Sequence, residues 1–255
     1  MDFLAAHTKA WSEMPPAHRS DSIPFARRDR LADLGQMASH FAHEIRNALV
    51  PVAMHLNRLR AVAEENPEAG QVLEKLEEGF AAVDAAANDL LFFSADRRVN
   101  RQIVSLRELV RETCESLTTR PQSAEVTLKL DISPLHTVMA DRDLMKRAVQ
   151  NLVRHALTSM PDGGELVITS YDGGDALELE IADSGPTLDS EVRRRIFEPF
   201  GASKDLESGL GLAVVRHIAL DHGGSASAVT CPEGGTAFTL RFPHAVQMRD
   251  RREAA

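Results

Sequence analysis

The sequence predicts an α+β protein in which a helical hairpin precedes a two-layer α/β sandwich. Residues 26–90 carry apolar side chains at intervals of three and four, the period of an amphipathic helix. Later residues alternate short strand patterns with helical patterns, which favours a sheet covered by helices. The pattern changes near residues 96–101, where we expect the boundary between the two parts. A chain of 255 residues, 43% of them hydrophobic, is long enough to bury both cores.

The first part is expected to be an antiparallel pair of long helices. The turn between them falls at "EENPEAG", where proline and glycine interrupt the helical pattern, and Pro51 is expected to bend the first helix. The two apolar seams run through Leu31, Leu34, Ala38, Phe41, Ile45, Leu49, Val52, Leu56 and Leu59, and through Val72, Leu76, Phe80, Val83, Ala87 and Leu90. One hairpin buries little apolar surface alone, so we expect two copies to form a homodimeric four-helix bundle.

The second part shows seven strand patterns and four helical patterns. Turn signals such as "YDGGD" join neighbouring strands, which is typical of a two-layer domain. We therefore expect four segments: a flexible lead at 1–25, the hairpin at 26–96, the α/β domain at 101–244 and a flexible tail at 245–255. The strand patterns are "RQIVSL", "EVTLKLDI", "TVMA", "GELVITSYD", "ALELEIAD", "SASAVT" and "TAFTLRF"; the helical ones lie at 106–118, 142–159, 190–197 and 210–222.

The composition of the chain limits the classes of protein to which it can belong. The net charge of −9 argues against wholesale nucleic-acid binding. Cys114 and Cys231 are too few and too far apart for a disulfide framework or a zinc site, which favours a reducing compartment. No apolar run approaches the roughly 20 residues of a membrane helix, and the N-terminus has no signal-peptide core. The expected location is the cytoplasm, without a membrane span.

The stretch "ASHFAHEIRNALVPV" (38–52) allows a metal site, a nucleophile with its base, or an ordinary polar helix face. With Phe41 and Ile45 in the apolar seam, His43 lies about 200° away and faces solvent, because a helix turns about 100° per residue. Asn47 is one turn further along the same face. Glu44 is adjacent and is able to orient or deprotonate the imidazole. A metal site lacks a third ligand at helical spacing, which disfavours that reading.

Four segments of the second part could bind a ligand. Asn151 and His155 lie one turn apart on one helix face, and Asp183 ends a strand where it could accept a hydrogen bond from an exocyclic amine such as that of adenine. Lys204 lies in a short stretch after an aromatic pair, and the glycines of "SGLGL" open a helix whose N-terminus can hold a phosphate. Each feature alone has an ordinary explanation as a turn, a cap or a solvated charge.

Taken in order, these motifs resemble those of two-component sensor histidine kinases. The resemblance covers residues 26–243 and implies a dimerisation and phosphoacceptor hairpin followed by an ATP-binding domain of the Bergerat fold. The motifs are "HEIRN" (the H box), "NLVRHALTSM" (the N box), "DSGPT" (the first glycine box), "IFEPFGASK" (the F box) and "SGLGLAVVRHIALDHGG" (the second glycine box). The short interval between "FEPF" and "GLGL" resembles the ATP lid of the nitrogen-regulator-like branch.

The resemblance implies a role for each matching residue. In the hairpin, His43 would be phosphorylated, Glu44 would assist, and Asn47 would serve dephosphorylation of a response regulator. In the second part the nucleotide-binding residues would be Asn151, His155, Asp183, Gly185, Lys204, Gly209, Leu210 and Gly211, with Asn151 and His155 at the metal positions. The implied cofactors are ATP and Mg²⁺ or Mn²⁺. The implied partners are a response regulator receiver domain, a second copy of the chain and a separate sensor subunit.

Three departures from the family pattern leave two functions open. His155 stands where the family has a Mg²⁺-coordinating asparagine, although Mg²⁺ prefers oxygen ligands. Pro186 and Thr187 follow Gly185 where a further glycine is expected, and Glu207 replaces the first glycine of the second glycine box. The leading interpretation is an ATP-dependent histidine kinase. The alternative is a degenerate kinase that acts as a phosphotransferase, a phosphatase or a dimeric scaffold without ATP-dependent activity.

Overall fold

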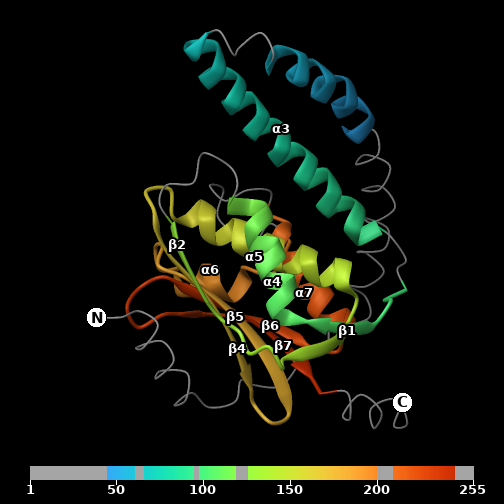
Figure 1. Cartoon of the computed structure of the whole chain (residues 1–255), viewed down its shortest axis with the longest axis vertical. Helices are drawn as coiled ribbons and strands as arrows, with labels where there is room; N and C mark the ends of the chain where they lie inside the picture. The colour runs from blue at the N-terminus through green and yellow to red at the C-terminus, as the bar shows by residue number, and fades with distance from the viewer. Residues whose placement is uncertain are drawn as a thin grey trace. The chain divides into compact units, whose positions relative to one another are not determined.

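The computed structural model describes residues 45–60, 66–94, 98–118, 126–199, 201 and 209–244. These residues form two compact units, one before residue 98 and one after it. The first unit is helical, and the second combines a sheet with helices (Figure 1). The α+β class expected from the sequence is confirmed.

The first unit contains a helix over residues 45–60 and the long helix α3 (Pro67–Ser94). The first helix continues through Pro51 without a break in its helical backbone. Asn66 caps the start of α3, because its Oδ1 accepts a hydrogen bond from the Ala69 amide at 3.3 Å. Pro67 then takes the first helical position, where its missing N–H costs nothing.

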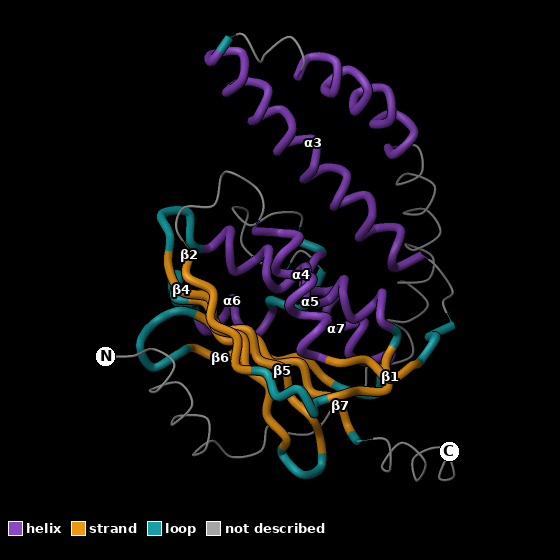
Figure 2. Tube along the Cα trace, viewed as in Figure 1, coloured by secondary structure: helices purple, strands orange, loops and turns teal. Residues whose placement is uncertain are grey.

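The second unit is built on a five-stranded sheet in the order β2-β4-β5-β7-β6, and β1 and β3 form a separate antiparallel pair. β2 runs parallel to β4, and the remaining neighbours in the sheet are antiparallel. Figure 2 shows the strands in orange. The strands are β1 (Gln102–Ser105), β2 (Val126–Asp131), β3 (Thr137–Ala140), β4 (Gly164–Asp172), β5 (Ala176–Asp183), β6 (Ser225–Thr230) and β7 (Thr236–Pro243). The helices are α4 (Leu106–Thr118), α5 (Arg142–Ser159), α6 (Ser190–Arg195) and α7 (Gly211–Asp221).

The core of the second unit lies between the sheet and its helices. Alternate residues of β4 and β5 point into this core, since successive side chains of a strand face opposite sides. Leu166, Ile168, Leu179 and Ile181 are fully buried there. α5 packs against α4, α7 and β5, so it is the central helix of this layer (Figure 1).

A buried histidine joins the end of α7 to the start of α5. His222, just after α7, accepts a hydrogen bond at Nε2 from the Asp141 amide at 2.9 Å and donates from Nδ1 to the Ile218 carbonyl at 2.7 Å. Asp141 is also the N-cap of α5, because its Oδ1 accepts from the amides of Asp143 and Leu144. Burial lowers the pKa of His222, which keeps the imidazole in the neutral form that this pattern requires.

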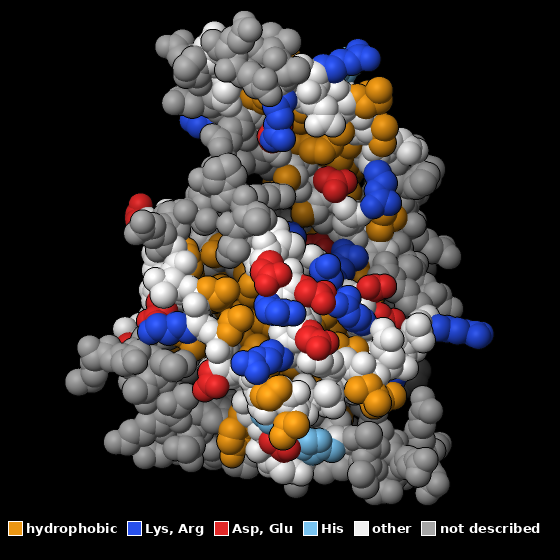
Figure 3. All heavy atoms as spheres, in the orientation of Figure 1, with side chains coloured by type: hydrophobic (Ala, Val, Ile, Leu, Met, Phe, Trp, Pro, Cys, Tyr) orange, Lys and Arg blue, Asp and Glu red, His pale blue; other side chains and the backbone are white. Residues whose placement is uncertain are grey.

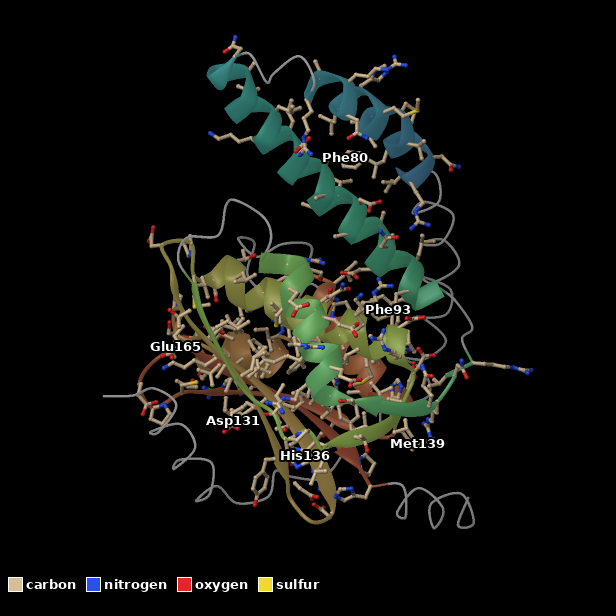
Figure 4. The ribbon with its side chains drawn as sticks, in the orientation of Figure 1. Phe80, Phe93, Asp131, His136, Met139 and Glu165 are labelled. Carbon is tan, nitrogen blue, oxygen red and sulfur yellow. The ribbon has the colours of Figure 1, made fainter. Side chains whose placement is uncertain are left out.

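The surface of the second unit carries charges of both signs. On the face drawn in Figure 3, basic and acidic side chains are interspersed over the helical layer. Arg142 pairs with Glu112 at 2.5 Å, and Lys129 pairs with Glu165 across β2 and β4 (Glu165 is labelled in Figure 4). Among the described helices, none combines the length and apolar character that crossing a bilayer requires.

Candidate functional site

Asp183 is the most deeply buried carboxylate of the predicted site. It ends β5 opposite Thr236 of β7, and only 1% of its surface is exposed. Its Oδ1 accepts a hydrogen bond from the Gly185 amide at 2.9 Å. Its Oδ2 is buried and has no hydrogen-bond partner among the described residues. An unpaired buried oxygen is costly, so it is a natural place for a ligand donor.

The environment of Asp183 also sets its ionisation. Desolvation raises the pKa of Asp183 to about 6, against the opposing effect of hydrogen bonds from Gly185, Ser159 and Thr236. The carboxyl is therefore ionised at neutral pH, where it acts only as an acceptor. This is the form that receives a hydrogen bond from an amine.

Gly185 lets the chain pass close to this carboxylate. A Cβ at this position would lie 2.8 Å from the Ser159 Oγ and 2.9 Å from the Asp183 Oδ1. Gly235, just before β7, approaches the backbone of the same residue: a Cβ there would lie 1.9 Å from the Asp183 carbonyl oxygen, and φ is +87°. Gly185 is therefore needed beside the carboxylate of Asp183 and Gly235 beside its backbone.

The start of α7 offers a second half to the site. Gly209 has φ +58°, and Leu210 then takes the N-cap position without a side-chain hydrogen bond to the helix. The first amides of α7, from Gly211 onward, therefore have no side-chain acceptor from the cap residue. A helix N-terminus of this kind attracts an anion such as a phosphate, because its amides and its dipole both favour negative charge.

α5 connects the two halves. Asn151, 8% exposed, donates from Nδ2 to the Gly211 carbonyl oxygen at 2.9 Å. Two turns later on the same helix face, Ser159 contacts the carboxylate of Asp183. α5 thus contacts two parts of the site. Near its C-terminal end it contacts the carboxylate of Asp183, which can accept a hydrogen bond from an amine, and near its middle it contacts the start of α7, which can bind an anion.

His155 lies between these two contacts but is turned into the packing. Its ring meets Phe238 of β7 edge-on, with centroids 5.0 Å apart, and Phe197 packs on the same phenylalanine at 6.2 Å. Both ring nitrogens are buried without a hydrogen-bond partner among the described residues. Desolvation lowers the pKa of His155 to about 4, so the imidazole is neutral under physiological conditions.

These residues do not fit Mg²⁺, which the family resemblance implies. Mg²⁺ requires oxygen ligands in near-octahedral geometry, and His155 presents an enclosed neutral imidazole instead. Asn151 offers a single oxygen, its Oδ1, because its Nδ2 donates to Gly211. Within the described residues no three histidine, cysteine or acidic side chains gather to hold a metal ion.

The predicted site residues fall into two groups. Asn151, His155, Asp183, Gly185, Gly209, Leu210 and Gly211 lie together around α5, β5 and the start of α7. Asn47 lies exposed on the helix over residues 45–60. His43, Glu44, Lys204 and Glu207 lie outside the described residues, so their placement stays a prediction. Thr187, which follows Gly185 where a further glycine was expected, is exposed.

Three further residues of the site were not predicted from the sequence: Ser159, Thr236 and Phe238. Ser159 follows His155 by four residues, as His155 follows Asn151. This repeated spacing puts all three on one helix face and could have identified Ser159 as a site residue. Thr236 and Phe238 face the site only because β7 pairs with β5 in the observed register. Nothing local in "TAFTLRF" indicates that register.

The fold and the site define a nucleotide-binding domain of the Bergerat type. Residues 140–246 match the family described as "Histidine kinase-, DNA gyrase B-, and HSP90-like ATPase". These residues contain α5, β5 and α7, so the match covers the site just described. The recognition of the fold from the sequence motifs is confirmed.

Over most of its length the chain is similar to sensor histidine kinases. It is 30% identical over 229 residues to the signal transduction histidine-protein kinase AtoS of Escherichia coli K12, covering 89% of this chain and 38% of AtoS. It is 29% identical to the sensor histidine kinase ZraS of Klebsiella oxytoca, covering 88% of this chain and 49% of ZraS. The chain thus spans half or less of the length of these two relatives.

A solved complex of the histidine kinase ThkA with the response regulator protein TrrA has a related structure. It matches with a TM-score of 0.63 and 25% identity, covering 87% of this chain and 65% of the matched chain. This match takes in more than the Bergerat domain, because it extends over most of the chain.

Proposed function

We propose that this protein is a two-component histidine kinase that binds ATP, autophosphorylates His43 and donates the phosphoryl group to an aspartate of a response regulator. The observation that carries the proposal is the buried Oδ2 of Asp183, which has no hydrogen-bond partner in the part of the chain that the structure describes. Through α5 it is linked to the start of α7, whose cap residue leaves the first amides without a side-chain acceptor. An acceptor for an amine and a helix end for phosphates are complementary to the two ends of ATP.

In this proposal the second unit positions the nucleotide. Asp183 accepts a hydrogen bond from the exocyclic amine of adenine, and the amides at the start of α7 hold phosphate oxygens. Lys204 supplies a positive charge to the phosphates. The work of the domain is positioning and charge stabilisation, because phosphoryl transfer needs little covalent help from the protein.

The hairpin supplies the acceptor. A ring nitrogen of His43 attacks the γ-phosphorus of ATP, a nitrogen–phosphorus bond forms, the bond to the ADP oxygen breaks, and the imidazole proton passes to Glu44. The histidine then passes its phosphoryl group to the regulator's aspartate. Asn47, an exposed residue four positions after His43 in the sequence, would orient a water that removes the phosphoryl group from the regulator.

The relatives and the hairpin surface support the partners. ThkA is solved with a response regulator protein, which supports a receiver domain as the partner of this chain. Ile45, Val52 and Leu59 follow one another at seven-residue intervals, and all three are exposed within one chain. Such a stripe is typical of a helix that packs against another helix, so we propose a homodimer through the hairpin. Because the proposed reaction consumes ATP, we propose that it takes place in the cytoplasm.

Labelled ATP tests the kinase. The purified wild-type protein should acquire an acid-labile label that His43→Gln does not, since a phosphoramidate hydrolyses in acid. Asn57→Ala, at another exposed position of the same helix, is the matched control and should label like wild type. Absence of label on the wild type with Mg²⁺ and with Mn²⁺ contradicts the kinase.

His155 supports a second candidate function. A pocket whose metal position holds an enclosed imidazole fits a degenerate kinase that uses only the His43 and Asn47 face, as a phosphotransferase, phosphatase or dimeric scaffold. Calorimetric titration with ATP separates the two candidates. Measurable binding supports the kinase, and absence of binding with either metal supports the degenerate protein.

A further inference from the structure

The position of His155 bears on how the nucleotide is held. His155 is one turn from Asn151 on α5, and the anion-binding start of α7 is bonded to that same asparagine. An ion that bridged phosphates to α5 would therefore lie beside position 155 as well as beside Asn151. The side chain at position 155 decides whether α5 offers a second ligand besides the Oδ1 of Asn151, which the hydrogen bond to Gly211 does not engage.

The environment of His155 is apolar, and although the residue as a whole is half-buried, both of its ring nitrogens are enclosed. Its ring packs edge-on against Phe238, which is itself fully buried and also contacts Phe197. Leu152 and Ala156, its neighbours on α5, are fully buried as well. A hydrated cation has no replacement for its lost water here, because an apolar wall supplies no oxygen.

The rest of the site supplies anion contacts that require no metal. The amides at the start of α7 attract phosphate through the helix dipole. Asp183 selects the base at the other end of the site, independently of the phosphates. A Mg²⁺ ion that is coordinated only by the triphosphate needs no ligand from α5.

We propose that this protein holds its nucleotide without a metal ion bridging to position 155 of α5, because the imidazole there has both nitrogens enclosed and packs on Phe238. Nucleotide affinity is then only weakly sensitive to Mg²⁺. The inference rests on the proposed nucleotide-binding function and specifies how that site differs from one with an oxygen ligand at position 155.

The test is a calorimetric titration with a non-hydrolysable ATP analogue, adenosine 5′-(β,γ-imido)triphosphate, in excess Mg²⁺ and in EDTA. For the wild type, the two dissociation constants should agree within about threefold, well inside the 10–100-fold typical of losing metal-site contacts. A loss of about tenfold or more in EDTA overturns the inference but leaves nucleotide binding intact. Absence of binding in both conditions contradicts the proposed function itself.

Variants at position 155 test the cause. His155→Asn restores an amide oxygen and should make binding Mg²⁺-dependent by about tenfold. His217→Asn makes the same substitution at an exposed position of α7 and should keep the wild-type ratio. A His155→Asn protein that folds, by circular dichroism, and stays indifferent to Mg²⁺ overturns the assignment to His155. If that variant does not fold, His155→Gln offers the same amide on a longer side chain and is judged by the same ratio.

Discussion

The side-chain amide of Asn151 donates a hydrogen bond to the carbonyl oxygen of Gly211, joining the middle of α5 to the first residue of α7 at 2.9 Å. Asn151→Ala removes the donor and with it the hydrogen bond between the two helices. We expect unfolding free energy, measured in urea, to fall by about 0.5–1.5 kcal/mol. Nucleotide affinity should fall as well, since the start of α7 loses its tether. Thr158→Ala, at an exposed position of α5, is the control and should change both quantities little.

Asp183 makes nucleotide binding depend on pH. Because burial raises the pKa of this carboxyl to about 6, it becomes protonated as the pH falls through that value, and Oδ2 then loses the negative charge that strengthens the hydrogen bond from the amine. Affinity should be full above about pH 7 and decline below pH 6, within a factor of ten per unit of pH. Titrations from pH 5 to 8 measure this.

The sign for stability is the opposite. A carboxyl whose pKa is higher in the folded state than in the unfolded state binds its proton more tightly when folded, so this group favours the folded state as the pH falls.

Asp183→Asn should remove the pH dependence of binding and lower the affinity at pH 8. An affinity of that variant that still falls below pH 6 would assign the titration to another group.

Substitution by alanine should have opposite effects on stability at Gly185 and at Gly79. At Gly185 a Cβ would approach Ser159 and Asp183 within 3 Å, so Gly185→Ala should reduce both stability and nucleotide binding. At Gly79, in the exposed middle of α3, a Cβ meets nothing within 4 Å. Gly79→Ala should therefore stabilise the hairpin by about 0.5–1 kcal/mol through helix propensity alone. Thermal unfolding of the two variants checks the contrast.

The exposed apolar stripe predicts a dimer. Val72 and Leu76 of α3 are more than half exposed in the single chain. Leu76→Glu places a charge in the proposed bundle core and should shift sedimentation equilibrium from dimer to monomer. Lys75→Glu, at the adjacent exposed position, reverses a charge outside the seam and should leave the dimer intact. A wild-type monomer at micromolar concentration would contradict the bundle.

Most of the second unit was predictable because its elements are short and strongly patterned. Each of the seven predicted strands corresponds to an observed one, and the pattern at 142–159 coincides with α5 from Arg142 to Ser159. Local signals mark these ends, such as the Asp141 cap before α5 and the glycine before α7. The expected bend at Pro51 does not interrupt the helix over residues 45–60.

The details of the site depended on contacts that sequence spacing does not carry. Asn151 and His155 lie on one helix face as predicted, yet Asn151 bonds to α7 while His155 packs on Phe238. The difference arises from where β7 lies, and that follows from the pairing of β7 with β5. The spacing of four on α5 predicted which residues share a face, and tertiary packing decided what each one touches.

His222 gives α5 and α7 a second connection, at the ends opposite to the Asn151 contact. With Asp141 bonded to His222 and Asn151 bonded to Gly211, the two helices are pinned at both ends of α7. The wall that faces the nucleotide is therefore preorganised, and little of the binding energy is spent on ordering it. Binding at this wall should consequently carry a small entropic penalty, and amide hydrogen exchange in α7 should already be slow in the free protein.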